Sequence, residues 1–128
     1  MKKSIFTFAL IFIATITFAQ KKHKNNRLDF VGKTYEYTIE ETHLNLTIIS
    51  NTEAKWLYVS SPNNETGKTE TEKATITKIA KGVYQITWTE KDGSNVIDIF
   101  NLNTNEVFVN FTLPDAKMYN LKANFKIK

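Results

Sequence analysis

The fold is decided by residues 74–110, ATITKIAKGVYQITWTEKDGSNVIDIFNLNTNEVFVN, which read as three β-strands joined by short turns. Apolar and polar side chains alternate in the middle strand, and one of its faces carries Tyr84, Ile86, Trp88 and Glu90. An Asp-Gly pair within residues 91–94 is typical of a hairpin turn, because glycine adopts a positive φ without steric cost. The stretch therefore predicts an antiparallel sheet with an aromatic face that ends in a carboxylate.

The same alternation continues on both sides of this stretch. Strands are predicted at residues 33–40, 44–50, 54–60, 70–80, 83–90, 95–101, 107–113 and 119–127. About eight strands joined by short turns predict an all-β protein with a single antiparallel up-and-down barrel, because closure removes exposed sheet edges. The interior of such a barrel is filled by side chains or holds one small ligand. A two-sheet sandwich is the alternative, which the lack of a long crossover connection disfavours.

The first residues do not belong to this barrel. Two lysines, an apolar run over residues 5–18 and the small-residue site at Ala19 predict a signal peptide, residues 1–19, that is removed on export. An uncleaved anchor is the alternative, but the run is shorter than the ~20 apolar residues of a spanning helix. We expect a polar basic linker at residues 20–29, a barrel domain at 30–128, and a secreted or periplasmic protein without a transmembrane span after cleavage.

Charge and cysteine content narrow the possible functions. The net charge of +4 comes from the N-terminal residues, since from Leu28 onward the chain has 11 Lys and Arg against 13 Asp and Glu. A slightly acidic domain argues against nucleic acid as a partner. The chain has no cysteine, so it forms no disulfide, and its only histidines, His23 and His43, fall in the predicted linker and a predicted turn. We therefore predict no metal site and no cofactor.

Two segments resemble a known family of barrels. These are residues 30–37, FVGKTYEY, and residues 82–90, GVYQITWTE, with the Asp-Gly turn that follows. They resemble the lipocalin-like barrel of the MoaF-like domain and, more distantly, the barrel of bacterial phenolic acid decarboxylases. The resemblance covers about residues 30–114 and implies a calycin-type fold.

The decarboxylases cleave a hydroxycinnamic acid inside the barrel without a cofactor, using tyrosines, an arginine and a glutamate. By this resemblance Glu90 takes the glutamate position and Tyr37 one tyrosine position. The other tyrosines correspond to Ile39 and Asn45, and no arginine stands near residues 67–68. The resemblance therefore implies that the decarboxylase activity is absent.

An aromatic inner face suggests a binding function. We expect an exported protein that binds a small amphipathic or aromatic molecule, with the ligand in contact with Tyr37, Trp56, Tyr84, Trp88 and Glu90. One alternative is a cofactor-independent lyase, in which Glu90 donates a proton and Tyr37 orients a carboxylate. Another is an envelope protein that interacts through its outer face. A barrel filled by its own aromatic side chains, with Glu90 in water at the strand end, would exclude both the ligand-binding function and the lyase. The sequence does not predict the oligomeric state.

Overall fold

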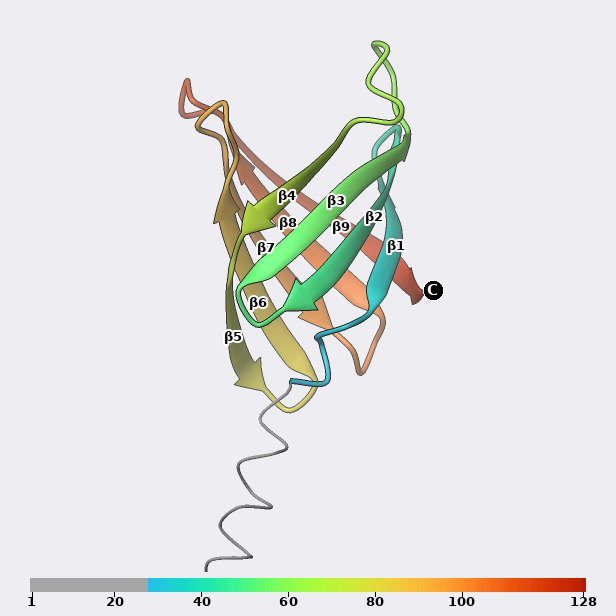
Figure 1. The fold of residues 1–128 in the computed structure, drawn as a ribbon, viewed down its shortest axis with the longest axis vertical. Helices are drawn as coiled ribbons and strands as arrows, with labels where there is room; N and C mark the ends of the chain where they lie inside the picture. The colour runs from blue at the N-terminus through green and yellow to red at the C-terminus, as the bar shows by residue number, and fades with distance from the viewer. Residues whose placement is uncertain (1–27) are drawn as a thin grey trace, which may run out of the picture.

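The computed structural model describes residues 28–128 as nine antiparallel strands that form a nearly closed barrel (Figure 1). The strands are β1 (Thr34–Ile39), β2 (Thr42–Ser50), β3 (Glu53–Ser60), β4 (Thr69–Lys73), β5 (Thr75–Ala80), β6 (Val83–Thr89), β7 (Asn95–Asn101), β8 (Glu106–Thr112) and β9 (Met118–Ile127). The all-β class and the barrel are confirmed. The predicted signal peptide and most of the predicted linker lie outside the described residues.

Hydrogen-bonded neighbours follow the order β4-β3-β2-β1-β9-β8-β7-β6-β5, so only β1 and β9 pair across a long sequence separation. Apart from β4 and β5, which form the two edges of the sheet, each strand pairs with the next along the chain, as in the predicted up-and-down connection. The described residues contain no helix with the length and apolar character needed to cross a membrane.

The prediction of one strand over residues 70–80 was wrong. The chain forms two strands there, because at Ala74 it leaves the edge of β3 and begins to pair with β6. Ala74 is buried, and its backbone N–H donates to the carbonyl of Thr52 at 2.9 Å. The two sheet edges are therefore consecutive in sequence and meet at this residue, where β4 also contacts β6.

The first hairpin turn is shorter than predicted. Ile39 pairs with Thr42, so the turn consists of Glu40 and Glu41, and Glu40 adopts a φ of 52°. His43, predicted in a turn, lies in β2 and faces outward, where its Nε2 is 3.2 Å from a carboxylate oxygen of Glu36.

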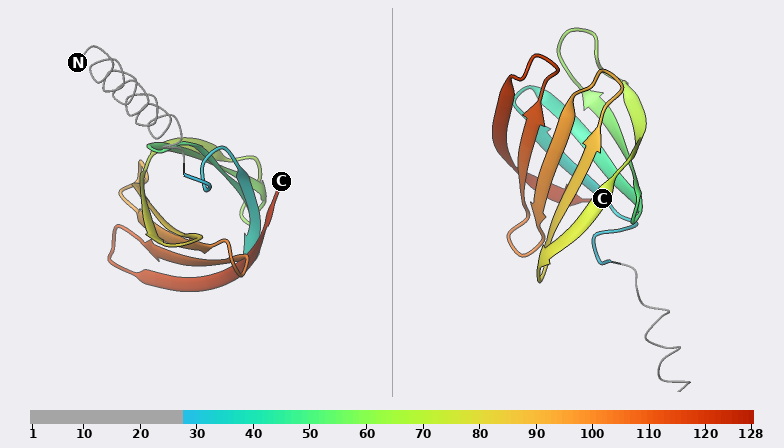
Figure 2. Two further views of the ribbon diagram at one scale, coloured as in Figure 1. Left: turned by 90° about the horizontal axis from the view of Figure 1, so that it is seen from below. Right: turned by 90° about the vertical axis from the view of Figure 1, so that its left-hand side faces the viewer.

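One end of the barrel is packed with aromatic rings. Residues 28–33 run across this end, and Figure 2 shows them inside the ring of strands. Phe30 is fully buried, stacks on Tyr84 at 5.2 Å between ring centroids, and lies 5.1 Å from Phe100. Tyr35 and Phe125 complete the cluster, and the Tyr35 hydroxyl donates to the Phe30 carbonyl at 2.9 Å. This core closes one end and leaves the interior beyond Phe100 unfilled.

Candidate functional site

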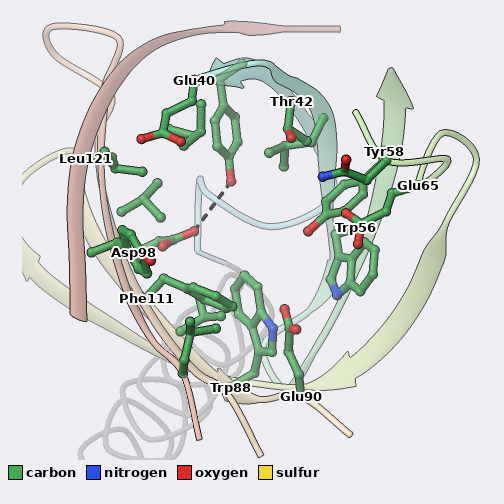
Figure 3. Close-up of a pocket in the computed structure, with 18 residues that line it drawn as sticks. Glu40, Thr42, Trp56, Tyr58, Glu65, Trp88, Glu90, Asp98, Phe111 and Leu121 are labelled. Carbon is green, nitrogen blue, oxygen red and sulfur yellow. Dashed lines mark hydrogen bonds between the residues drawn. The ribbon is translucent and has the colours of Figure 1, made fainter. Parts of the chain in front are cut away.

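The interior beyond the aromatic core is a cavity of about 570 Å³ (Figure 3). Alternation places the inward side chains of most strands along its wall. Its lining residues are Tyr37, Ile39, Glu40, Thr42, Leu44, Trp56, Tyr58, Asn63, Glu65, Trp88, Glu90, Val96, Asp98, Val109, Phe111, Leu113, Tyr119 and Leu121. Several of them belong to the turns at the end opposite Phe30. We call this end of the cavity the mouth, formed by Glu40, Asn63, Glu65, Leu113 and Tyr119.

The cavity wall is largely aromatic. Both tryptophans of the chain, Trp56 and Trp88, line it and are at least nine-tenths buried. The ring of Trp56 lies 4.8 Å from that of Tyr58, and its indole N–H donates to Glu72 at 3.2 Å. These rings offer flat apolar surfaces to a ligand, and they place both of the chain's fluorophores where a ligand would lie.

Asp98 is the most buried carboxyl group of the cavity. It lies at the middle of β7 between Val96 and Phe100, and only 1% of its surface is exposed. The Tyr37 hydroxyl donates to its Oδ2 at 3.4 Å, which the dashed line in Figure 3 marks. Its Oδ1 is buried and has no hydrogen-bond partner. Burial raises the pKa of Asp98 well above its ordinary value, although the Tyr37 hydrogen bond opposes this rise.

Glu90 directly follows β6 and begins the hairpin turn, where its carbonyl accepts a hydrogen bond from the Gly93 N–H at 3.0 Å. It lines the cavity and is half-buried. Desolvation raises its pKa to about 7, and the nearby carboxylate of Asp92 adds to this rise. The indole N–H of Trp88 faces Glu90 in Figure 3 and partly offsets the shift, although it does not complete a hydrogen bond. A pKa in this range suits a group that gives or takes a proton near neutral pH.

The electrostatic character of the cavity is one-sided. Four carboxyl groups line it, those of Glu40, Glu65, Glu90 and Asp98, and no lysine, arginine or histidine does. None of the four forms an ion pair with another described residue. Lys68 and Lys91 lie outside the lining; Lys68 is 6.0 Å from the Trp56 ring, and Lys91 is 3.8 Å from Glu70. Nothing in the cavity wall balances its acidic groups.

The structure brings together four of the five residues predicted to contact a ligand. Tyr37, Trp56, Trp88 and Glu90 line the cavity. Tyr84 shares the inward face of β6 but lies in the aromatic core, stacked on Phe30. The structure adds Asp98, Tyr58 and Phe111. Asp98 shares its strand face with Val96 and Phe100, and a carboxylate between two apolar side chains is the signal that could have identified it.

The lining offers few hydroxyl groups and no imidazole. It contains neither serine nor histidine, and Thr42 is its only hydroxyl outside the tyrosines. Within residues 28–128 no group of three or more His, Asp or Glu is placed to hold a metal ion. What the cavity offers is aromatic surface, proton exchange at Glu90 and an unpartnered carboxyl oxygen.

Comparisons with known proteins identify a similar fold and the family of this barrel. No curated protein sequence matches the chain. A crystal structure described as a putative beta-lactamase from Burkholderia vietnamiensis is similar, with a TM-score of 0.73 and 20% sequence identity, covering 81% of this chain and all of that one. At this identity the likeness concerns the fold alone. The model of the MoaF-like family matches residues 31–126, so this chain belongs to the MoaF-like family.

Proposed function

We propose that this is an exported protein that binds a small amphipathic or aromatic molecule inside its barrel without transforming it. The observation that carries the proposal is the cavity of about 570 Å³ between the aromatic core and the mouth. Ligand sites in proteins are commonly ~300–1,000 Å³ and are lined by apolar and aromatic groups with a few polar ones. Export rests on the signal-peptide pattern of residues 1–19.

The buried polar atoms also support binding. Asp98 Oδ1 and Trp88 Nε1 are both buried and without partners among the described residues. A buried polar group without a partner costs about 1–3 kcal/mol. A ligand that offers a donor to one and an acceptor to the other would remove this cost, and a cavity kept in this state is typical of a binding site.

The test is native mass spectrometry on the protein purified from the envelope of its own cells, before and after organic extraction. We expect a bound mass of a few hundred daltons that extraction removes, and N-terminal sequencing that begins at Gln20. Binding is followed by tryptophan fluorescence, because both tryptophans line the cavity. A bare polypeptide whose fluorescence no amphiphile or aromatic compound changes would reject the proposal.

A second candidate is a cofactor-independent lyase, and the neutral-range pKa of Glu90 is the observation that favours it. In this reaction the bond to the substrate's carboxylate breaks and CO2 leaves, Glu90 gives its proton to the carbon that carried the carboxylate, and Tyr37 orients the carboxylate beforehand. The cavity opposes an acidic substrate, because no cationic side chain lines it to hold a carboxylate. The candidate is tested by incubating the protein with hydroxycinnamic acids; turnover that Glu90→Gln leaves unchanged, or no turnover at all, would exclude this role of Glu90.

A further inference from the structure

We propose that the ligand carries a protonated primary or secondary amine on an apolar body, and that this ammonium group binds Asp98 in the depth of the cavity. The inference rests on the proposed binding function and specifies the ligand for the same site. It follows from the Asp98 geometry, the charges of the wall and the placement of the aromatic rings.

Asp98 lacks one hydrogen-bond partner among the described residues. Tyr37 satisfies one carboxyl oxygen, and the other is buried, unpartnered and next to the empty part of the barrel. Its neighbours across the sheet are Ile86 on β6 and Val109 on β8, which offer no donor. The missing donor therefore has to come from the cavity side. An N–H of a ligand ammonium group at hydrogen-bond distance would supply it.

The charged groups of the cavity favour a cation over an anion. The titratable groups that act on Asp98 are Tyr37, through its hydrogen bond, and Glu90, through its charge, and neither is cationic. Glu40 and Glu65 at the mouth add the same sign of charge along the entry path. A carboxylate or phosphate entering this cavity would meet four acidic groups and no positive partner. An ammonium group is attracted along the whole path, because opposite charges attract each other strongly in a partly desolvated site.

The aromatic wall of the cavity favours an apolar body for the rest of the ligand. Tyr37, Trp56, Tyr58, Trp88 and Phe111 provide ring faces and edges around the unfilled space. Such rings stabilise a nearby cation through their negative faces and bury an apolar chain or ring. The wall between Asp98 and the mouth therefore suits an apolar body, which places the ammonium group deepest.

Three probes with the same body test the inference: 4-phenylbutylamine, 4-phenylbutanol and 4-phenylbutanoate. Their binding to the exported protein is followed at pH 7 by tryptophan fluorescence. We expect the amine to bind about tenfold or more tightly than the alcohol, as a charge-assisted hydrogen bond predicts, and the carboxylate to bind most weakly. Equal binding of the amine and the alcohol, or tighter binding of the carboxylate, would overturn the inference while leaving cavity binding intact.

Variants locate the effect. Asp98→Asn should bring the amine to the affinity of the alcohol, whereas Asp29→Asn, the same substitution at an exposed residue beside the aromatic core, should keep the preference. Retention of the preference in Asp98→Asn would overturn the assignment to Asp98. The order of the three probes in the unaltered protein decides the ligand class even if Asp98→Asn does not fold. No response to any probe at millimolar concentration would reject the inference and the proposed function together.

Discussion

Replacing Glu90 by glutamine should make the protein more stable at alkaline pH and leave its stability almost unchanged at acidic pH. The reason is the raised pKa of Glu90, which moves from 4.5 to about 7 on folding because the carboxylate loses water in the barrel. The folded state therefore holds this proton more tightly than the unfolded state. The stability that results is fully present below pH 4.5 and is lost as the pH rises through about 7.

The magnitude follows from the same values. Each pH unit between the unfolded and the folded pKa is worth about 1.4 kcal/mol, so a fully buried group with this shift would lose about 3 kcal/mol by pH 8. Glu90 is only half-buried, and the water that reaches it reduces the cost to about 1–2 kcal/mol. Glutamine does not titrate and avoids this loss. The free energy of unfolding of Glu90→Gln should therefore exceed that of the unaltered protein by about 1–2 kcal/mol at pH 8.

The assay is urea denaturation of both proteins at pH 4.5 and pH 8, with Glu53→Gln as the matched control. Glu53 is exposed at the start of β3, so its substitution should shift stability equally at both pH values. The nearby carboxyl groups of Asp92, Glu72 and Glu70 are present in both proteins, so their effects largely cancel in the comparison. A difference between Glu90→Gln and the unaltered protein that does not grow between the two pH values would refute the reasoning.

Three further outcomes are expected. Gly82→Ala should lower the free energy of unfolding, measured by urea denaturation, by about 1–3 kcal/mol, because Gly82 has a φ of +73° and an added Cβ would lie 2.6 Å from Asn103. Gly67→Ala, at a φ of +87° with open space around it, should lower it less. Equal losses would show that the contact with Asn103 is harmless. Phe100→Ala should lower the free energy of unfolding by about 3–5 kcal/mol, whereas Phe108→Ala, at an exposed position, should lower it by less than about 1 kcal/mol. Thermal unfolding that ranks the two variants the other way would contradict the assigned core. Binding of 4-phenylbutylamine should tighten from pH 6 to pH 8 and release protons, because the ammonium group favours the ionised forms of Asp98 and Glu90. Calorimetry in two buffers measures the proton release. An affinity that falls between pH 6 and pH 8 would contradict this prediction.

Strand faces were predictable from the sequence, but position along the barrel axis was not. Alternation placed Tyr84 and Trp88 on the same face, and the structure confirms that both point inward. It could not tell that Tyr84 would stack on Phe30 while Trp88 would line the cavity. That distinction depends on how residues 28–33 fold across one end of the barrel, which is a tertiary contact without a periodic signal.

Two other features show the same limit. Alternation continues through Ala74 without a break, so the pattern predicts one strand where the structure has two that serve opposite sheet edges. Asp98 could be assigned to the inward face from its neighbours, yet its importance comes from Tyr37 on β1, which is 61 residues away in the chain. Residue types and faces are local properties, whereas the unpartnered oxygen is a property of the closed barrel.

The aromatic core around Phe30 limits how a ligand enters and leaves the protein. Among residues 28–128, it fills the end of the barrel opposite the mouth, so the cavity opens at the mouth. A ligand therefore leaves along the path by which it entered, and the group that enters first leaves last. The other end of the ligand, its tail, stays nearest the mouth throughout. A partner at the mouth would therefore contact the tail of the ligand first, whereas the hydrogen bond between the ammonium group and Asp98 has to break before the ligand can leave.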